Sequence, residues 1–269
     1  MNRKEYWNDT YVKYWKEATA EANDTSSSES HVKKLYKGDS KTAGEKVIFN
    51  TLDLLRIQNQ EKLLDYGCGF GRLVPYFASR SADYYGIDIS EAMIEECRKQ
   101  YPDLAERFFV AEGENLPFPD AFFDKIVCYA VFDACYQETA LQEMFRVLKV
   151  EGEILLSGKN TNYFADDGQA YIAEEAARVK GHPNYFTDVK AMIDAICSEG
   201  GGEIVLQRFF LYRGDEAKEK YVESMPEKFY QWYLIIKKRK PVRGFPKFSD
   251  AYSETWKLKQ TQLEENDAR

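Results

Sequence analysis

Residues 63–72, with the sequence LLDYGCGFGR, join a short apolar strand to a glycine-rich turn that leads into a helix. Glycine at alternate positions removes the Cβ atoms that would keep a ligand away from the backbone, and it permits backbone angles that other residues resist. The helix that begins beyond the turn offers unpaired N–H groups to the polar part of a ligand. These features predict a nucleotide-like ligand at the end of the strand.

A second strand, residues 84–88 with the sequence YYGID, ends in the carboxylate of Asp88. A carboxylate about 20 residues beyond a glycine turn is placed to accept hydrogen bonds from both hydroxyls of a ribose. The ligand is therefore expected to contain adenosine. A dinucleotide fingerprint would need a third glycine at position 72, where Arg72 stands. A nicotinamide oxidoreductase is thus the weaker alternative.

The pattern that is present, Asp65 followed by Gly67, Gly69 and Gly71, resembles the first motif of class I S-adenosylmethionine-dependent methyltransferases. Further segments resemble that family's motifs in the family's order. GIDISEAM at 86–93 is similar to the family's ribose strand and the helix after it, and AEGENLPFPD at 111–120 is similar to its adenine loop. FDKIVCY at 123–129 is similar to the family's fourth strand, and residues 143–157 are similar to the helix and strand that follow it. On this resemblance, which covers residues 46–240, the chain is identified as a member of the family.

The resemblance implies which residues hold S-adenosyl-L-methionine. The loop of Asp65, Gly67 and Gly69 would hold the methionine part and Asp88 the ribose. Glu112 stands where the family commonly has an aspartate that binds the adenine amino group. Because glutamate is one methylene longer, the backbone of the next two residues is an alternative for this contact. The expected cofactor site comprises Asp65, Gly67, Gly69, Arg72, Asp88, Ile89, Met93, Glu112, Gly113 and Tyr129, with ordinary helix packing as the alternative role of Ile89 and Met93.

The acceptor pocket is expected between the ends of the fourth and fifth strands and an insertion that follows them. His182 or a tyrosine such as Tyr129 would take a proton from the acceptor. Lys159 would attract an anionic acceptor, with a solvent-exposed strand end as the alternative. We therefore name Tyr129, His182 and Lys159 as the catalytic candidates. The candidate lining residues are Tyr129, Phe132, Lys159, Asn160, Tyr163 and His182.

Composition limits the partners and the compartment. The 269 residues include 37 basic and 45 acidic side chains, a net charge of −8, which argues against a nucleic-acid partner. Five cysteines without a Cys-x-x-Cys pair favour a reducing compartment, and two histidines argue against a histidine-based metal site. We find no apolar run of membrane-spanning length and no signal peptide at the start. We therefore expect a cytoplasmic protein with a small-molecule substrate, no metal and no membrane partner; the oligomeric state is not predicted.

Strands and helices alternate from residue 62 onward, which predicts parallel strands with right-handed crossovers. With the resemblance, the expected fold is α/β: a doubly wound, mostly parallel seven-stranded sheet with an antiparallel last strand, the Rossmann-like methyltransferase fold. Strands are expected at 62–66, 84–88, 107–110, 124–129, 153–158, 203–212 and 229–237, and helices at 5–20, 43–55, 71–79, 91–100, 138–148, 169–180 and 187–199.

Three regions are expected along the chain. Residues 1–45 would form an N-terminal helical lid, because aromatic residues at helical spacing, from Trp7 to Trp15, precede a polar run at 23–30. Plain packing of that helix is the alternative. Residues 46–240 would form the methyltransferase domain, with the insertion at about 160–185, and residues 241–269 a polar C-terminal extension.

These observations predict an enzyme that transfers the methyl group of S-adenosylmethionine to a small molecule. The displacement occurs at a carbon already activated by the sulfonium, so the protein mainly aligns donor and acceptor. The aromatic residues near the start resemble those of enzymes of surface-polysaccharide and nucleotide-sugar pathways. The expected acceptor is therefore an oxygen of an anionic or a sugar- or nucleotide-linked metabolite. The alternative is a non-catalytic, methyltransferase-like binding module.

Overall fold

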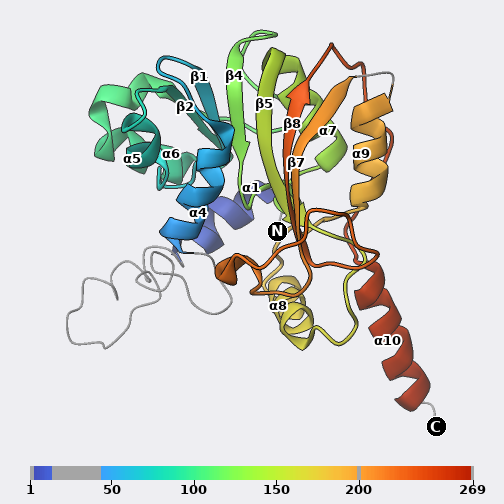
Figure 1. Ribbon diagram of the computed structural model, residues 1–269. Coiled ribbons are helices and arrows are strands. Elements are labelled where there is room, and N and C mark those ends of the chain that lie inside the picture. The colour runs from blue at the N-terminus through green and yellow to red at the C-terminus, as the bar shows by residue number, and fades with distance from the viewer. Residues whose placement is uncertain (1–2, 14–43, 199–200, 268–269) are drawn as a thin grey trace.

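A seven-stranded sheet forms the centre of this computed structural model, which describes residues 3–13, 44–198 and 201–267 (Figure 1). The strand order is β3-β2-β1-β4-β5-β8-β7. The strands are β1 (Lys62–Tyr66), β2 (Asp83–Asp88), β3 (Phe108–Val110), β4 (Phe123–Cys128), β5 (Leu148–Lys159), β7 (Gly202–Phe210) and β8 (Gln231–Lys238). The order reverses direction between β1 and β4, and such a switch point is where ligands bind in open α/β sheets.

The pairing of the strands confirms the predicted fold class. β1 pairs in parallel with β2 and β4, β2 with β3, and β4 with β5. β8 pairs antiparallel with both β5 and β7, so the last strand of the sheet in chain order alone is reversed. All carboxyl ends except that of β8 therefore meet at one edge of the sheet.

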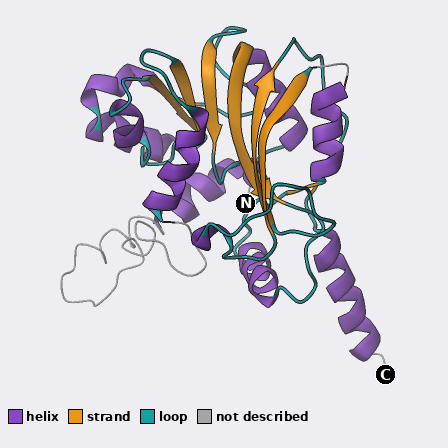
Figure 2. Cartoon of the chain, viewed as in Figure 1, coloured by secondary structure: helices purple, strands orange, loops and turns teal. Residues whose placement is uncertain are grey.

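Helices cover both faces of the sheet (Figure 2). Helices α4 (Glu45–Leu52), α5 (Val74–Ala78) and α6 (Glu91–Gln100) pack on one face, and α7 (Gln137–Val147) and α9 (Val189–Cys197) pack on the other. α1 (Arg3–Glu5), the π-helical turn Tyr6–Tyr11 that continues it, and α8 (Gly168–Val179) lie near the carboxyl ends of the central strands (Figure 1). No helix within the described residues is both long and apolar enough to cross a membrane.

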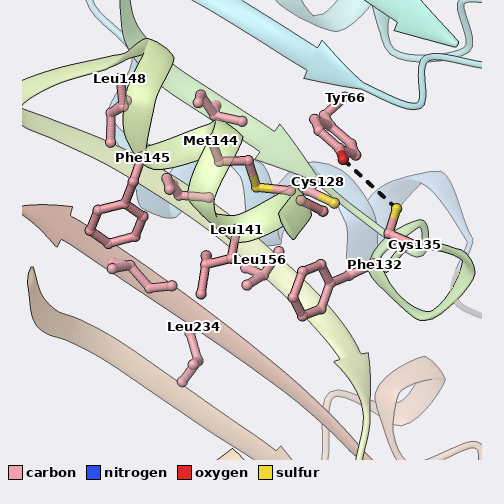
Figure 3. Close-up of a cluster of buried hydrophobic side chains, with 14 of the residues drawn as sticks. Tyr66, Cys128, Phe132, Cys135, Leu141, Met144, Phe145, Leu148, Leu156 and Leu234 are labelled. Atoms are coloured by element: carbon pink, nitrogen blue, oxygen red, sulfur yellow. Dashed lines mark hydrogen bonds between the residues drawn. The ribbon is translucent and has the colours of Figure 1, made fainter. Parts of the chain in front are cut away.

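Side chains of successive strand residues enter two different cores, because they point to opposite faces of the sheet. Leu63 packs with the α4–α6 side, whereas its neighbour Leu64 packs with the α7–α9 side. The second core is shown in Figure 3, where Leu141, Met144 and Phe145 of α7 meet side chains of the sheet. The same alternation decides, at the carboxyl end of each strand, on which face of the sheet a side chain lies.

The glycine turn is longer than the sequence indicated. A helix was predicted over 71–79, but α5 begins at Val74. Gly67, Gly69 and Gly71 have φ angles of 79°, 53° and 73°, which a right-handed helix does not contain. The chain therefore stays in a turn through Leu73. The helix predicted over 5–20 is helical from Arg3 to Lys13, and its residues 14–20 lie outside the described part.

The C-terminal extension has more structure than the sequence predicted. Strand β9 (Ser249–Asp250) pairs with β6 (Phe186–Thr187) in a second, two-stranded sheet, and helix α10 (Glu254–Asp267) follows. Glu138 of α7 accepts hydrogen bonds from the backbone N–H groups of Phe248 (2.7 Å) and Ser249 (2.8 Å). Sequence periodicity could not reveal this docking, because it depends on a two-residue strand and on polar anchors rather than on an apolar stripe.

Candidate functional site

A cavity of about 1070 Å³ opens at the carboxyl ends of β1, β2 and β4. Its wall combines the glycine turn, the end of β2, the loop after β3, the loop after β4, the end of β5, the loop after α8 and the first described helix of the chain. The sequence-predicted residues that line it are Asp65, Gly67, Gly69, Arg72, Asp88, Ile89, Met93, Gly113, Tyr129, Lys159 and His182. Among the predicted cofactor residues, Glu112 alone is not part of this wall.

The N–H groups of the glycine turn are bonded within the protein. Those of Gly67 and Cys68 donate to the carbonyl of Ile87 (2.9 and 2.8 Å), and that of Gly71 donates to Cys68. These N–H groups of the turn are therefore engaged within the protein, whereas the prediction of unpaired N–H groups concerned the helix that begins beyond the turn. The turn uses its own N–H groups to fasten itself to the end of β2. A Cβ atom at Gly67 would lie 2.6 Å from two carbons of Val131, so the turn also needs glycine there for space.

Asp88 lies at the end of β2 with its carboxylate toward the turn. One oxygen accepts the N–H of Gly69 (3.0 Å) and the other accepts the N–H of Ser90 (2.9 Å). Burial raises the pKa of this carboxyl, while the backbone hydrogen bonds from Ser90 and Gly69 lower it. A carboxylate has about four lone-pair sites, so Asp88 can still accept a hydrogen bond from a ligand.

Asp65 lies at the end of β1 and is almost fully buried, with 3% of its surface exposed. It accepts a hydrogen bond from the Tyr84 hydroxyl (3.0 Å). Burial raises the pKa of the Asp65 carboxyl to about 7, against the opposing effect of the Tyr84 hydrogen bond, and the nearby Asp88 raises it further. The carboxylate is therefore poised to ionise when a cation comes close.

The loop after β3 turns a different acid toward the cavity than the sequence predicted. Gly113 and Glu114 line the cavity, whereas the side chain of Glu112 is 59% exposed. A Cβ atom at Gly113 would lie 1.7 Å from the hydroxyl oxygen of Tyr66, which explains the glycine. Arg3 donates to Glu114 through both guanidinium Nη atoms, with Nη2 to Oε2 at 2.7 Å. The first described helix is thereby tied to this loop.

Tyr129, just after β4, is held by a buried acid that the sequence did not single out. Its hydroxyl donates to Glu216, which is 8% exposed, and lies 3.2 Å from the Tyr233 hydroxyl. Burial raises the pKa of Tyr129 well above its usual value, and the Glu216 carboxylate raises it further. Tyr129 is therefore a neutral hydroxyl in the cavity wall.

Asp133, Lys159 and His182 converge at another part of the cavity wall. The Lys159 ammonium nitrogen lies 3.0 Å from Asp133 and 3.3 Å from Glu174, and it donates to the side-chain oxygen of Asn184 at 3.1 Å. The alternative in which Lys159 ends its strand in solvent is wrong, because only 20% of its side chain is exposed. The three remaining lining candidates, Phe132, Asn160 and Tyr163, are buried elsewhere and do not line the cavity.

His182 is covered by the first described helix. Its ring packs edge-on against Tyr6 and Trp7, with centroids 5.2 and 5.1 Å away. Burial lowers the pKa of His182 below 6.5, while the charge of Asp133 raises it and that of Lys159 lowers it. Its Nδ1 atom is buried without a hydrogen-bond partner in the described structure. Among the described residues, no group of histidine, cysteine and acidic side chains could hold a metal ion.

Comparison with known proteins adds independent support for the family. Residues 64–156 match a family model described as a methyltransferase domain. The ubiquinone/menaquinone biosynthesis C-methyltransferase UbiE of Bordetella avium (strain 197N) is 33% identical over 112 residues, covering 39% of this chain and 44% of that protein. The malonyl-[acyl-carrier protein] O-methyltransferase of Enterobacter lignolyticus (strain SCF1) is 28% identical over 147 residues, covering 54% and 56%.

Together with the sheet order and the motifs, these matches decide the family. Residues 64–156 form the methyltransferase domain of a class I S-adenosylmethionine-dependent methyltransferase. Among solved structures, the S-adenosylmethionine-dependent methyltransferase from Mesorhizobium loti has a TM-score of 0.56 and 18% identity, covering 71% of this chain and 98% of that one. At that identity the likeness supports the fold alone. The matched region spans about half the length, or less, of the curated relatives.

Four polar side chains of this methyltransferase site escaped sequence reasoning: Arg3, Glu114, Asp133 and Glu216. Glu114 lies in the loop that the family resemblance had already marked, so its type and place were a usable signal. The other three reach the site through pairings with residues far away in the sequence. Arg3, for example, meets Glu114 across 111 positions.

Proposed function

We propose that this chain binds S-adenosyl-L-methionine and transfers its methyl group to an oxygen atom of a small molecule. The observation that carries the proposal is the extent of the cavity. It runs from the glycine turn and Asp88 to Asp133, Lys159 and His182, and its volume is at the upper end of the usual range for small-molecule sites. Such a space accommodates a donor and an acceptor together.

The proposed cofactor contacts follow the strand ends. Asp88 accepts the ribose hydroxyls, and the turn of Gly67 and Gly69 with Asp65 holds the methionine part. Ile89 and Met93 give the adenine apolar neighbours. Gly113 and Glu114, rather than Glu112, lie beside the adenine, because they line the cavity and Glu112 does not.

The proposed chemistry is an in-line displacement. The acceptor oxygen forms a bond to the methyl carbon, the bond from that carbon to sulfur breaks, and S-adenosylhomocysteine leaves. For a hydroxyl acceptor, the proton goes to His182, whose lowered pKa keeps its ring neutral near pH 7. Alignment and the exclusion of water by Tyr6 and Trp7 supply the rest.

The acceptor is proposed to be the hydroxyl of a sugar- or nucleotide-linked metabolite. The sequence suggested an anionic oxygen as an equal choice, on the basis of Lys159. That choice loses its physical support, because two carboxylates already surround the Lys159 ammonium group. The names of the curated relatives include both a C-methyltransferase and an O-methyltransferase, so they do not favour one target atom.

One pair of measurements tests the proposal. Calorimetric titration should show binding of S-adenosylmethionine and none of NAD. The protein is then incubated with S-adenosylmethionine labelled in its methyl group and with pooled sugar and nucleotide-sugar metabolites. The labelled methyl group should be transferred to one of these metabolites. Binding without transfer to any acceptor would favour the non-catalytic binding module, and binding of NAD alone would contradict the cofactor.

A further inference from the structure

We propose that the acceptor end of the cavity recognises a hydrogen-bond donor, a hydroxyl or an amine, through the carboxylate of Asp133, and that it disfavours carboxylate and phosphate groups. The proposal rests on the function proposed above and specifies its acceptor. It depends on counting which hydrogen-bonding groups around Asp133, Lys159 and His182 remain free for a ligand.

Protein oxygens already surround the Lys159 ammonium group. An ammonium group carries three N–H donors. Three oxygens lie around the Lys159 nitrogen, from Asp133 at 3.0 Å, Glu174 at 3.3 Å and Asn184 at 3.1 Å. An anionic ligand would have to displace one of these oxygens, two of which belong to carboxylates.

Glu174 is a structural anchor for Lys159 and does not line the cavity. It is fully buried, with 0% exposed. One of its oxygens accepts the Tyr230 hydroxyl at 2.5 Å and faces Lys159, while the other accepts the side-chain amide of Asn184. Both oxygens are therefore engaged inside the protein, and the lysine is held in place from behind.

Asp133 differs from Glu174 because it lines the cavity and keeps free lone pairs. A carboxylate offers about four lone-pair sites. Lys159 engages one oxygen of Asp133, and the residue's own backbone N–H is the other hydrogen-bond donor that lowers its pKa. His182 lines the same wall, so a ligand that binds Asp133 lies beside its ring.

The charges agree with the hydrogen-bond count. Asp133 and Glu174 carry two negative charges against the single positive charge of Lys159, so this end of the cavity has a net negative charge. A neutral hydroxyl or a protonated amine suits that field, whereas a carboxylate or phosphate meets repulsion and an ammonium group that protein oxygens already surround.

The test uses two probe sets, each with an alcohol, an amine and a carboxylate of similar shape. The first set is glucose, glucosamine and glucuronate, and the second is benzyl alcohol, benzylamine and benzoate. Binding is followed through the ring resonances of His182, one of only two histidines in the chain, assigned with His182→Gln. In each set that binds, we expect the alcohol or amine to bind at least roughly ten-fold more tightly than the carboxylate, as expected for a hydrogen bond to a charged group.

Asp133→Asn turns an acceptor into a donor at nearly the same shape. We expect this substitution to weaken the binding of the alcohol and of the amine roughly ten-fold and to strengthen the binding of the carboxylate. The matched control is Glu153→Gln, which alters a similarly buried ion pair, Lys125–Glu153 at 2.7 Å, whose residues do not line the cavity. Glu153→Gln should keep the order of probe affinities that the parent protein has.

Three results would overturn the proposal. The carboxylate could bind as tightly as the alcohol and amine of its set, the order of probe affinities could be unchanged in Asp133→Asn, or the His182 resonances could fail to shift with either probe set. Each titration is run with and without S-adenosylhomocysteine. Failure of S-adenosylhomocysteine and S-adenosylmethionine to bind would contradict the proposed function instead. The two failures are distinguishable, because the affinities of the probes are also measured without either compound.

Discussion

Asp88 joins the glycine turn to the start of α6, since its two oxygens accept the N–H groups of Gly69 and Ser90. A residue with this double role is sensitive to substitution in two ways. Its loss removes the proposed ribose contacts, and it also leaves two backbone donors without their acceptor. Variants at this position must therefore separate binding from stability.

We expect Asp88→Ala to weaken S-adenosylmethionine binding by about 2–4 kcal/mol, because two hydrogen bonds to a charged acceptor are lost. Calorimetric titration measures the change, with thermal unfolding of each variant beside it. Asp83→Ala is the control, since Asp83 lies at the other end of β2 and pairs with Arg107. Asp88→Asn keeps the fold-stabilising oxygen, so unchanged affinity in both Asp88 variants would show that the ribose lies elsewhere.

His182 should titrate below 6.5, and its neighbours should move that pKa in opposite directions. Asp133→Asn removes a negative charge that favours the imidazolium, so the pKa of His182 should fall further. Lys159→Met removes a positive charge that opposes it, so the pKa should rise. NMR titration of the histidine ring protons measures both. If His182 is the base, the rate of methyl transfer should fall as the pH decreases through this pKa. Shifts of the His182 pKa that have the same sign in both variants would contradict the arrangement.

At the level of elements, the first described helix bridges two walls of the cavity. Arg3 holds the loop after β3 through Glu114, while Tyr6 and Trp7 cover His182 of the loop after α8. The turn Tyr6–Tyr11 is π-helical, a geometry often found at functional sites. The lid stays a prediction for the described part of this segment, and the predicted hinge at 23–30 lies outside the described residues.

We expect Arg3→Met to weaken S-adenosylmethionine binding and to speed its dissociation, because the helix loses its paired hydrogen bonds to Glu114. The loss of this charge-assisted pair should raise the dissociation constant roughly ten-fold. Stopped-flow fluorescence, with Trp7 as a local reporter, follows the release. The neighbouring Lys4 is exposed, so Lys4→Met should behave like the parent protein. Identical release in all three proteins would reduce the helix to plain packing.

The second sheet attaches the C-terminal extension through Glu138. Glu138→Ala leaves the backbone N–H groups of Phe248 and Ser249 without their acceptor, so we expect the free energy of unfolding to fall by about 2 kcal/mol. Urea denaturation measures it. Glu95→Ala, at an exposed position of α6, should change stability by less than about 0.5 kcal/mol. A loss no larger than that control would mean that the extension is held mainly by other contacts.

For the whole molecule, the sequence predicted the sheet and the cofactor edge because their signals are local. β1 and α6 have the predicted bounds, and Asp65, Gly67 and Asp88 meet at one edge as parallel strand ends must. Residues that reach the site across long sequence separations carried no such signal. Tyr129 and Glu216 are 87 positions apart and meet only because β4 and the loop before β8 lie side by side.

The pairing of Lys159 shows the same limit in electrostatic terms. The sequence places a lysine at the end of β5, but its effect on a ligand depends on which acids surround it. Asp133 and Glu174 come from the loop after β4 and from α8, and neither is near Lys159 in the sequence. The sign of the local charge is therefore a property of the folded molecule.

Proton uptake and cofactor binding should be coupled through Asp65. With a pKa of about 7 in the folded protein against an ordinary value of 3.8, this carboxyl is mostly protonated at pH 6. Between these two values the folded state binds more protons than the unfolded state. The contribution of Asp65 to stability is therefore present at low pH and is lost as the pH rises through about 7.

S-adenosylmethionine carries a sulfonium and an ammonium group, and a cation beside Asp65 favours the ionised carboxylate. Binding should therefore release protons below a pH of about 7, and affinity should increase as the pH rises toward that value. Calorimetry in two buffers of different ionisation enthalpy counts the protons released, up to about one. Asp65→Asn cannot ionise, so it should bind more weakly and release no proton through this position. Proton release that persists in Asp65→Asn would assign the linkage to another group, whereas its absence in the parent protein would place the methionine part of the cofactor away from Asp65.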